Sequence, residues 1–341
     1  MDPLEVLIVG AGPIGLEVAW HLQEAGVRTR VVDAGGIGQT IATHFPPATR
    51  FFSSPERLAI AGMAVPVPTQ EKITGEEYLA YLRAVVLTRG IEVDTYQRVT
   101  AAEPAAAGWQ VTLSDPCGRE RAVHARRVVL ACGGTHRPRR LGIPGEDLPH
   151  VHTWLGDPHR FFQRRVLVVG GRNSAVESAL RCWRVNADVS LSYRGDAISE
   201  RVKYWLRPEV QSLIDEGRIA AHPGTTPVEI TPEHVTLRRG DQTTRVPVDD
   251  VLLQIGFEQD DTLMRLFGAR TSGPQQAPEF NPATLETTAP DVYVAGTAIA
   301  GTQQRFKAYI ETSHDHGPRI AAAVTGAEPP EVAEARVLPE S

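Results

Sequence analysis

The residues best suited to chemistry in this sequence are the glycines of GAGPIG at positions 10–15, which follow an apolar run at 6–9. Each has a separate task in such a pattern: Gly10 allows a tight turn, Gly12 lets a pyrophosphate approach the backbone, and Gly15 lets helix and strand pack closely. The helix that follows would present unpaired N–H groups and a positive dipole end to phosphates. Asp33 closes the next apolar run and is placed to accept hydrogen bonds from a ribose hydroxyl. This order of elements predicts a dinucleotide site, and the alternative is a βαβ unit without a ligand.

A weaker copy of the pattern occupies the middle of the chain. The apolar run at 166–169 leads into GGRNSA at 170–175, where Arg172 stands in place of the second glycine. The next strand ends at Arg194, where the first copy has an acid. A basic residue there favours a ribose that carries a 2′-phosphate, so the second site is predicted to bind NADPH. Arg201 and Lys203 are close enough in sequence to assist, and a solvated surface charge is the alternative for each.

Composition narrows the class of protein. The chain has 341 residues, of which 42% are hydrophobic, and a formal net charge of -6. These values predict a soluble globular protein with room for two domains, and the interspersed charges make nucleic acid an unexpected partner. No apolar run has the length of a membrane span, and the acids Asp2 and Glu5 argue against a cleavable signal peptide, so we expect a cytoplasmic protein.

The cysteine and histidine content argues against a metal centre. Cys117, Cys132 and Cys182 are far apart in sequence and form no CxxC pair, so we expect reduced thiols and no disulfide framework. Cys132 is the candidate for a reactive thiol, because it follows a strand expected to touch a cofactor, although a small buried side chain is the favoured interpretation. His314 and His316 are two apart on a predicted helix and would face different sides, which is poor geometry for one metal.

Periodicity and chain breakers predict the elements of the first half. Residues 43–60 are rich in proline and serine and should form a loop, either over a cofactor or on the surface. Thr74 with Glu77 predicts the capped start of an amphipathic helix. RVVLACGG at 127–134 predicts a buried strand that ends in small residues, and 135–149 reads as a linker.

The second half is predicted in the same way. Hairpin strands are expected within 228–256, at VEI, VTLRR, TRVPV and VLLQIG, with a turn at Gly240-Asp241. The run at 291–298 predicts another strand that enters small residues. A helix should follow from about Phe306 to Val324, interrupted near Gly317-Pro318. Two βαβ dinucleotide units in one chain imply two cofactors that face each other, and hence hydride transfer.

The chain resembles the low-molecular-weight pyridine nucleotide-disulfide oxidoreductases, the thioredoxin-reductase-like flavoproteins. The motifs that carry this resemblance are GAGPIG with Asp33, VVLACGG followed by LGIPGED, GGRNSA with YRG, LLQIGF, and VYVAGTA. Within this group it is most similar to the bacillithiol disulfide reductases (bacilliredoxin reductases), through GPIGLE, HFPPATRFFSSPERL, GGRNSAVESAL and IETSHDHG. The resemblance implies an α/β fold of two Rossmann-like domains, with the NADPH domain (151–255) inserted into an FAD domain (1–150 and 256–341). It also implies a homodimer.

The fingerprints and the resemblance together predict the residues at each cofactor. Those expected at FAD are Gly10, Gly12, Pro13, Ile14, Gly15, Asp33, Gln39, Thr40, Phe52, Ser53, Ser54, Ala131, Gly133, Gly296, Thr297, Ala298, Glu311 and His316. Those expected at NADPH are Gly170, Gly171, Arg172, Asn173, Ser174, Arg194, Arg201, Lys203 and Gly256. No side chain is assigned a catalytic role, because the flavin carries the chemistry. His316 is expected beside the flavin or as a structural group, and N–H groups near Glu311 and Thr312 could stabilise a reduced, anionic flavin.

Three departures from the family pattern bear on function. No CxxC precedes the second fingerprint, so an internal disulfide relay is excluded. Ile14 occupies the position of a cysteine that many bacillithiol disulfide reductases carry, which weakens the case for a disulfide substrate. Thr297 replaces an aspartate of the C-terminal FAD motif, and its hydroxyl can still make one hydrogen bond to FAD.

The predicted function is that of an FAD-dependent reductase that consumes NADPH and passes electrons to an external acceptor. By resemblance, that acceptor is bacillithiol disulfide or a bacilliredoxin mixed disulfide. A ferredoxin- or flavodoxin-NADP reductase of the same fold is the alternative within enzymes. A flavin-bound redox sensor without turnover is the alternative of another class.

Overall fold

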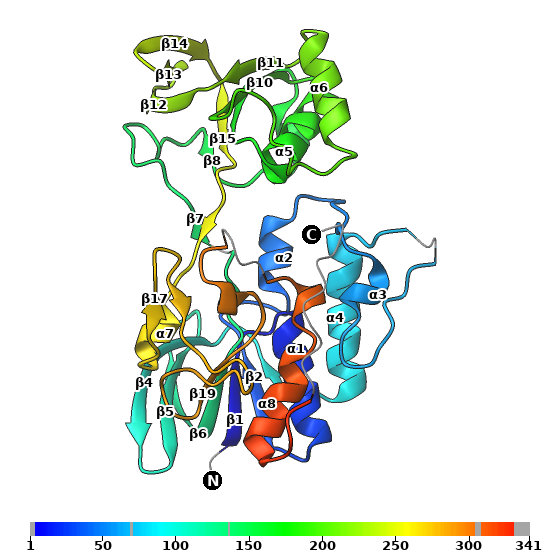
Figure 1. Ribbon diagram of the computed structural model, residues 1–341, viewed down its shortest axis with the longest axis vertical. Coiled ribbons are helices and arrows are strands. Elements are labelled where there is room, and N and C mark those ends of the chain that lie inside the picture. Colours follow the sequence, from blue (N-terminus) through cyan, green and yellow to red (C-terminus); the bar gives the residue numbers. More distant parts are fainter. Residues whose placement is uncertain (1–3, 69–70, 136, 304–307, 331–341) are drawn as a thin grey trace. The chain divides into compact units, whose positions relative to one another are not determined.

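The chain folds into two units, one inserted into the other. The computed structural model describes residues 4–68, 71–135, 137–303 and 308–330. Unit 1 comprises Met1–Arg137 and Phe257–Ser341, and unit 2 is the single segment Pro138–Gly256 (Figure 1). Each unit contains its own sheet with parallel central strands and its own hydrophobic core. The α/β class and the pair of Rossmann-like folds predicted from the sequence are confirmed.

The division falls earlier than the expected boundary between residues 150 and 151. Residues 138–149 of the predicted linker instead belong to unit 2. The Glu146 carboxylate accepts hydrogen bonds from the backbone N–H groups of Leu141 and Gly142, at 2.6 and 2.8 Å, and Ile230 N–H donates to the Pro144 carbonyl at 2.9 Å. The chain returns to unit 1 after Gly256.

A mixed sheet with the strand order β3-β2-β1-β6-β5-β4 forms the centre of unit 1. Strands β1, β2, β3, β6 and β19 run parallel, and β4 and β5 extend the sheet antiparallel. The chain steps from β1 outward through β2 and β3, and then returns to place β6 on the other side of β1. The carboxyl ends of β1 and β6 therefore form the switch point at which open α/β sheets bind ligands.

The strands of unit 1 are β1 (Leu4–Val9), β2 (Thr29–Val32), β3 (Val93–Asp94), β4 (Arg98–Ala105), β5 (Gly108–Ser114), β6 (Glu120–Leu130), β16 (Phe257–Glu258), β17 (Thr271–Ser272), β18 (Ala277–Pro278) and β19 (Val292–Val294). Its helices are α1 (Pro13–Glu24), α2 (Gln39–His44), α3 (Pro55–Leu58), α4 (Gly75–Arg89), α7 (Thr262–Leu266), η2 (Gly296–Ala300), η3 (Ile310–Thr312) and α8 (His316–Thr325). The short strand β7 (Arg137–Pro138), at the boundary, pairs with β16.

Unit 2 repeats the same plan around a five-stranded parallel sheet in the order β11-β10-β9-β15-β8. Its strands are β8 (Val151–His152), β9 (Arg165–Val169), β10 (Asp188–Tyr193), β11 (Ala220–Pro223), β12 (Thr226–Ile230), β13 (His234–Arg239), β14 (Gln242–Pro247) and β15 (Asp250–Leu253). Its helices are η1 (Pro158–Phe161), α5 (Asn173–Arg184) and α6 (Arg207–Asp215). The switch point of this sheet lies between β9 and β15, because β10 and β11 lie on the other side of β9.

Several predicted elements are confirmed and three need correction. The capping box at Thr74 is present, with Glu77 N–H donating to the Thr74 hydroxyl at 3.2 Å. The first three predicted hairpin strands form the antiparallel sheet β12-β13-β14, but the fourth, β15, joins the parallel sheet beside β9. Residues 43–60 are not wholly loop, because α2 ends at His44 and α3 lies within them.

The C-terminal helix begins later than predicted. Residues 304–307 lie outside the described residues, and helix α8 begins only at His316. Gly317 and Pro318 therefore lie in its first turn, where proline is tolerated because the N–H group of such a residue has no partner within the helix. Glu311 and Thr312 belong to the separate 3-10 turn η3, and not to a continuous helix.

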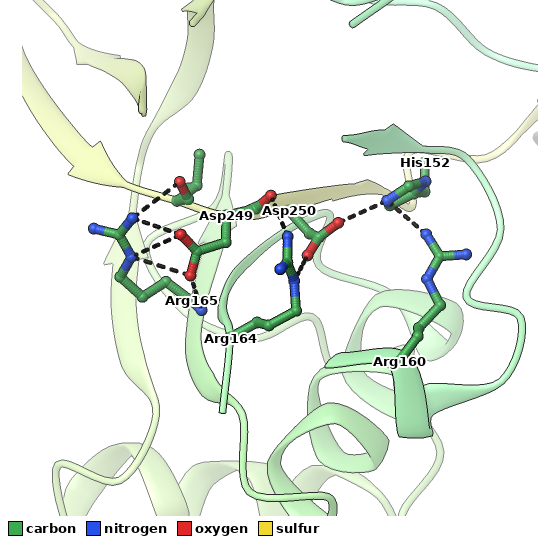
Figure 2. Close-up of polar contacts among 7 residues, drawn as sticks. His152, Arg160, Arg164, Arg165, Asp249 and Asp250 are labelled. Atoms are coloured by element: carbon green, nitrogen blue, oxygen red, sulfur yellow. Dashed lines mark hydrogen bonds and ion pairs between the residues drawn. The ribbon is translucent and has the colours of Figure 1, made fainter. Parts of the chain in front are cut away.

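A polar network lies where β9 and β15 begin, at the edge opposite the switch point of unit 2 (Figure 2). The Asp250 carboxylate is buried and contacts His152 Nε2 at 2.9 Å and the Arg164 guanidinium. Beside it, Arg165 Nη2 lies 2.6 Å from Asp249 Oδ1, and Arg165 N–H donates to Asp249 Oδ2 at 2.8 Å. Hydrogen bonds from the Arg165 side chain and backbone lower the pKa of Asp249 from its ordinary value of 3.8 to about 2.

We predict that Asp249→Asn lowers the free energy of unfolding at pH 7 by about 1 kcal/mol, a modest value because both side chains remain partly exposed. The folded-state pKa is depressed, so the stabilisation is present above about pH 4 and is lost as the pH falls toward 2. Urea denaturation at pH 7 and pH 3 measures both quantities, with Asp241→Asn in the exposed β13–β14 turn as the control. A difference between Asp249→Asn and wild type that did not shrink at pH 3 would contradict this account.

Candidate functional site

The first fingerprint turn is held by close backbone packing. Gly10 has φ of +118°, and a Cβ there would lie 2.3 Å from the Ala131 carbonyl oxygen. A Cβ at Gly15 would lie 1.9 Å from the Gly10 carbonyl oxygen. Neither contact is possible for a real side chain, so both glycines are required by the protein's own packing.

Gly12 differs from these two glycines. Its φ of −77° is ordinary for any residue, and a Cβ there would meet no protein atom within 4 Å. Neither backbone conformation nor packing therefore requires glycine at this position. Open space beside the bare backbone fits the approach of a pyrophosphate, which is the physical test that an FAD site has to pass.

The N-terminus of α1 is open to an anion. No side chain caps it, Pro13 occupies its first turn, and that turn contains no acidic residue. Asp33 stands beside it, with Oδ2 accepting from Ala11 N–H at 2.7 Å and Oδ1 accepting from Gly35 N–H at 2.8 Å. These bonds fix the carboxylate, and each oxygen keeps a lone pair for a further donor such as a ribose hydroxyl.

The start of α2 closes over the same turn. Gly38 N–H donates to the Ala11 carbonyl at 3.0 Å, and Gln39 Oε1 accepts from Gly36 N–H at 2.8 Å. Thr40 is the next residue of the helix and is half-buried. Gln39 and Thr40, which are expected at FAD from the sequence, are therefore brought next to the first fingerprint.

The ends of β6 and β19 meet beside Ile14. Ala131 N–H donates to the Val9 carbonyl at 2.8 Å, which aligns the small residues after β6 with the fingerprint. Gly133 has φ of +76°, and the nearest atom to a Cβ there is Thr297 Oγ1 at 3.7 Å. A Cβ at Gly296 would lie 3.1 Å from Ile14 Cβ, so Ile14 packs against the C-terminal motif. Ala298, in η2, is fully buried.

His316 links α8 to this motif. Its Nδ1 accepts a hydrogen bond from Gly296 N–H at 2.9 Å, so the neutral ring carries its proton on Nε2. Burial lowers the pKa of His316 to about 4, which keeps the ring neutral at physiological pH. This geometry gives His316 a structural role, one of the two roles expected from the sequence.

The FFSS loop meets η3. Ser53 Oγ donates to Glu311 Oε1 at 2.6 Å, and His314 Nε2 lies 2.8 Å from the Arg57 carbonyl. The half-buried Phe52 and Ser54 flank this contact, and Ser54 precedes α3. The structure thus joins two segments that are far apart in sequence and that the family resemblance had both assigned to the FAD site.

The cysteines are not arranged for thiol chemistry. All three are free. Burial is the main cause that raises the pKa of Cys132 to about 12, and Asp260 and Asp33 raise it further. Burial also raises the pKa of Cys182 to about 12. Because the thiolate is the reactive form, neither group is activated. Among residues 4–68, 71–135, 137–303 and 308–330, no cluster of three or more His, Cys, Asp or Glu residues could hold a metal ion.

The second fingerprint has the same turn and a different second position. Gly170 has φ of +142°, and a Cβ there would lie 2.3 Å from the Gln254 carbonyl oxygen. Gly171 lies against Tyr193, with 3.1 Å between the two Cβ positions. The N-terminus of α5 is uncapped, and Arg172, at its N-cap, is exposed, as is Ser174 in its first turn.

Cationic residues lie at this N-terminus and in the segment that follows β10. Arg194 is exposed immediately after β10, and Asn173 Oδ1 accepts from Lys203 N–H at 2.8 Å, which ties the segment after β10 to the start of α5. Within the described part of the chain, the guanidinium groups of Arg172, Arg194 and Arg201 have no ion-pair partner. Lys203 differs, because its Nζ lies 5.8 Å from the Trp205 ring centroid. Gly256, exposed with φ of +94°, ends unit 2.

Gln259 is a buried polar residue that no sequence pattern identifies. Its side chain is 1% exposed, and both amide atoms lack a hydrogen-bond partner among the described residues, although its backbone N–H donates to Thr302 Oγ1 at 2.8 Å. Its Oε1 lies 3.0 Å from where a Cβ of Gly134 would be. Burying an unpaired amide costs stability, and such costs concentrate at functional sites.

We predict that Gln259→Leu raises the free energy of unfolding of FAD-free protein by about 1 kcal/mol, because an apolar side chain of similar size removes an unsatisfied buried amide. Chemical denaturation compares it with wild type, and Gln110→Leu on the exposed face of β5 is the control. A loss of stability would instead show that a buried water molecule pairs the amide.

A comparison with known protein families identifies the general class of enzyme to which the chain belongs. Residues 7–296 match the family described as pyridine nucleotide-disulphide oxidoreductase. Together with the two dinucleotide units, this places the chain among the oxidoreductases that use FAD and NADPH.

The particular family follows from full-length relatives. The bacilliredoxin reductase Bdr of Bacillus subtilis (strain 168) is 30% identical over 95% of this chain and 98% of its own length. The solved bacillithiol disulfide reductase Bdr (YpdA) from Bacillus cereus has a TM-score of 0.91 at 30% identity, over 95% of this chain and 99% of that one. A ferredoxin–NADP reductase of Ignicoccus hospitalis is 29% identical over 75% of this chain and 78% of its own length. The chain belongs to the bacilliredoxin reductase family.

Proposed function

We propose that this protein takes hydride from NADPH and delivers electrons, through FAD, to bacillithiol disulfide or to a bacilliredoxin mixed disulfide. The observation that carries the proposal is the pair of uncapped fingerprint turns. The first has open space at Gly12, and the second is accompanied by Arg172, Arg194 and Arg201, which have no ion-pair partner among the described residues. Membership of the bacilliredoxin reductase family supports the choice of acceptor.

Each fingerprint would hold its cofactor by different means. In unit 1, the bare backbone at Gly12 and the α1 N-terminus would face the pyrophosphate, and Asp33 would accept from the ribose hydroxyls. The segments around Gln39, Ser53, Ala131, Thr297 and Glu311 would line the remainder of the FAD site. FAD, when bound, accepts hydride and passes electrons on.

In unit 2, side chains would supply the positive charge. Arg172 stands at the α5 N-terminus, where a pyrophosphate would bind, and Arg194 stands at the end of β10, where a ribose 2′-phosphate would bind. Arg201 would add to this field. Lys203 would act mainly by positioning its segment, because its N–H is bonded to Asn173.

The acceptor would have to reach the FAD site itself. The chain has no CxxC pair, Cys132 is held as a thiol, and Ile14 is buried against Gly296. No side chain of the fingerprint can therefore form a mixed disulfide with the acceptor. We further propose a cytoplasmic, homodimeric enzyme; the three free cysteines are compatible with a reducing compartment, and no helix of the described chain could span a membrane.

A ferredoxin-NADP reductase activity is the second candidate. It is favoured by Ile14, since transfer of single electrons from FAD to a protein cluster requires no cysteine, and by the Ignicoccus hospitalis relative. A flavin-bound redox sensor is the third possibility, and it differs from both enzymes in lacking steady turnover.

We predict that the purified protein carries FAD, that NADPH bleaches its visible absorption rapidly, and that bacillithiol disulfide restores the colour. Stopped-flow absorbance measures each step, with ferredoxin and flavodoxin as competing oxidants. Faster reoxidation by ferredoxin or flavodoxin would favour the second candidate, slow reoxidation by all of them would favour a sensor, and failure to bind FAD would exclude all three.

We predict that Arg194→Ala weakens NADPH binding by about ten- to a hundredfold, because a charge-assisted phosphate contact of roughly 1.5–3 kcal/mol is lost. NADH, which lacks the 2′-phosphate, should be affected little. Arg172→Ala is the matched variant: it should weaken NADPH and NADH by similar factors, because both carry the pyrophosphate. Equal losses for the two nucleotides in Arg194→Ala would show that Arg194 does not contact the 2′-phosphate.

A further inference from the structure

The chain between β10 and α6 carries two neighbouring aromatic residues, Tyr204 and Trp205. Tyr204 is 79% exposed, which is unusual for so large a ring. The Trp205 ring is perpendicular to the Tyr204 ring, with 4.8 Å between the two ring centroids. Lys203 Nζ lies over the Trp205 ring, 5.8 Å from its centroid. The Trp205 contact holds Tyr204 while leaving most of its surface open.

This segment is anchored rather than loose. Ile198 and Val202 are buried in the core of unit 2, and Leu206 packs against the same core. Val202 N–H donates to the Ser199 carbonyl at 3.0 Å, and Leu206 N–H donates to the Lys203 carbonyl at 2.9 Å. These contacts hold the segment to unit 2, and Tyr204, between Val202 and Leu206, remains exposed.

The anchor places Tyr204 next to the nucleotide site. Lys203 N–H donates to Asn173, the first residue of α5, at 2.8 Å, and Tyr204 is the next residue along the chain. Consecutive Cα atoms are about 3.8 Å apart, so the backbone of Tyr204 lies one residue step from the residue that is bonded to Asn173. Arg194 ends β10 on the same side of the sheet as the α5 N-terminus.

The chemistry of the ligand follows from this arrangement. We consider a dinucleotide with its pyrophosphate at the α5 N-terminus and its 2′-phosphate at Arg194. Its adenine is attached to the ribose carbon next to the one that carries the 2′-phosphate. The segment that leaves β10 is then the part of unit 2 that the base reaches. An exposed aromatic face flanked by cations is suited to stack on a purine ring.

We propose that Tyr204, supported by Trp205, forms the stacking platform for the adenine of NADPH. This inference rests on the proposed function, because it requires that unit 2 binds NADPH. The proposed stacking adds a contact to the adenine of the nucleotide, and this contact does not depend on the 2′-phosphate.

The test uses the FAD-loaded enzyme, three adenine nucleotides and one hydride donor that lacks adenine. Tyr204→Ala should weaken 2′,5′-ADP and 5′-ADP by the same factor, about five- to fiftyfold, as expected for the loss of one base–aromatic stack. Tyr204→Phe should bind both as wild type does. With NADPH, Tyr204→Ala should raise KM and leave kcat unchanged, and with reduced nicotinamide mononucleotide, which has no adenine, it should change neither. Quenching of Trp205 fluorescence by 2′,5′-ADP gives a readout that does not depend on turnover.

Phe162→Ala is the matched control, because Phe162 is a second exposed ring of unit 2, 52% exposed, placed after η1. It should bind both nucleotides normally. Unchanged binding of 2′,5′-ADP to Tyr204→Ala, while Arg194→Ala weakens it, would overturn the inference and leave the proposed function intact. A raised KM for the acceptor alone would also overturn it and would assign this surface to acceptor docking. Failure of wild type to bind 2′,5′-ADP or to oxidise NADPH would count against the proposed function itself.

Discussion

The whole structure depends on one steric constraint, the turn that carries a strand directly into an uncapped helix. At Gly10 and Gly15, and again at Gly170, backbone atoms approach so closely that a Cβ would overlap a carbonyl oxygen. This close packing brings each helix N-terminus to the carboxyl end of its strand with its N–H groups free. The neighbouring features follow from that turn: Asp33 is fixed by Ala11 N–H, α2 is fastened to the Ala11 carbonyl, and Lys203 is tied to the first residue of α5. An uncapped helix end presents N–H groups without intrahelical partners and is electropositive, so each of the two ends is suited to bind an anion.

The two sites use this common turn differently. In unit 1 the proposed recognition surface is mostly backbone and short side chains that are already hydrogen-bonded within the protein, as at Asp33 and Gln39. In unit 2 the proposed surface consists of long exposed cations at Arg172, Arg194 and Arg201. A preorganised backbone cradle loses little entropy when its ligand binds, whereas long side chains must be ordered each time. The first arrangement suits a cofactor that stays bound, and the second suits one that arrives and leaves in every cycle.

Much of this architecture could be predicted from the sequence because it depends on local patterns. Short segments encode both fingerprints, the helix capped at Thr74, and the contrast between Asp33 and Arg194. The predictions that were wrong concern elements whose pairing or position is determined by tertiary packing. The fourth hairpin strand, β15, has an ordinary apolar pattern, and only its pairing with β9 shows that it belongs to the parallel sheet. The residues near 140 look like a linker by composition, yet the Glu146 carboxylate organises them as part of unit 2. The buried amide of Gln259 and the anchored exposure of Tyr204 depend on neighbours that are distant in sequence, so no local pattern identified them.

Strand β6 has a consequence for how the chain is made. Its amino half pairs with β5, and its carboxyl half pairs with β19 on the same side, through Val128 with Val292 and Leu130 with Val294. Unit 2 is a single uninterrupted segment, so it can fold on the ribosome as soon as it has emerged. Unit 1 cannot complete its sheet until the last strand is synthesised, and until then the edge of β6 remains exposed at its most apolar end. The sheet of unit 1, although its first strand is synthesised first, is therefore completed last. Unit 2 can already be folded before β19 joins the sheet of unit 1.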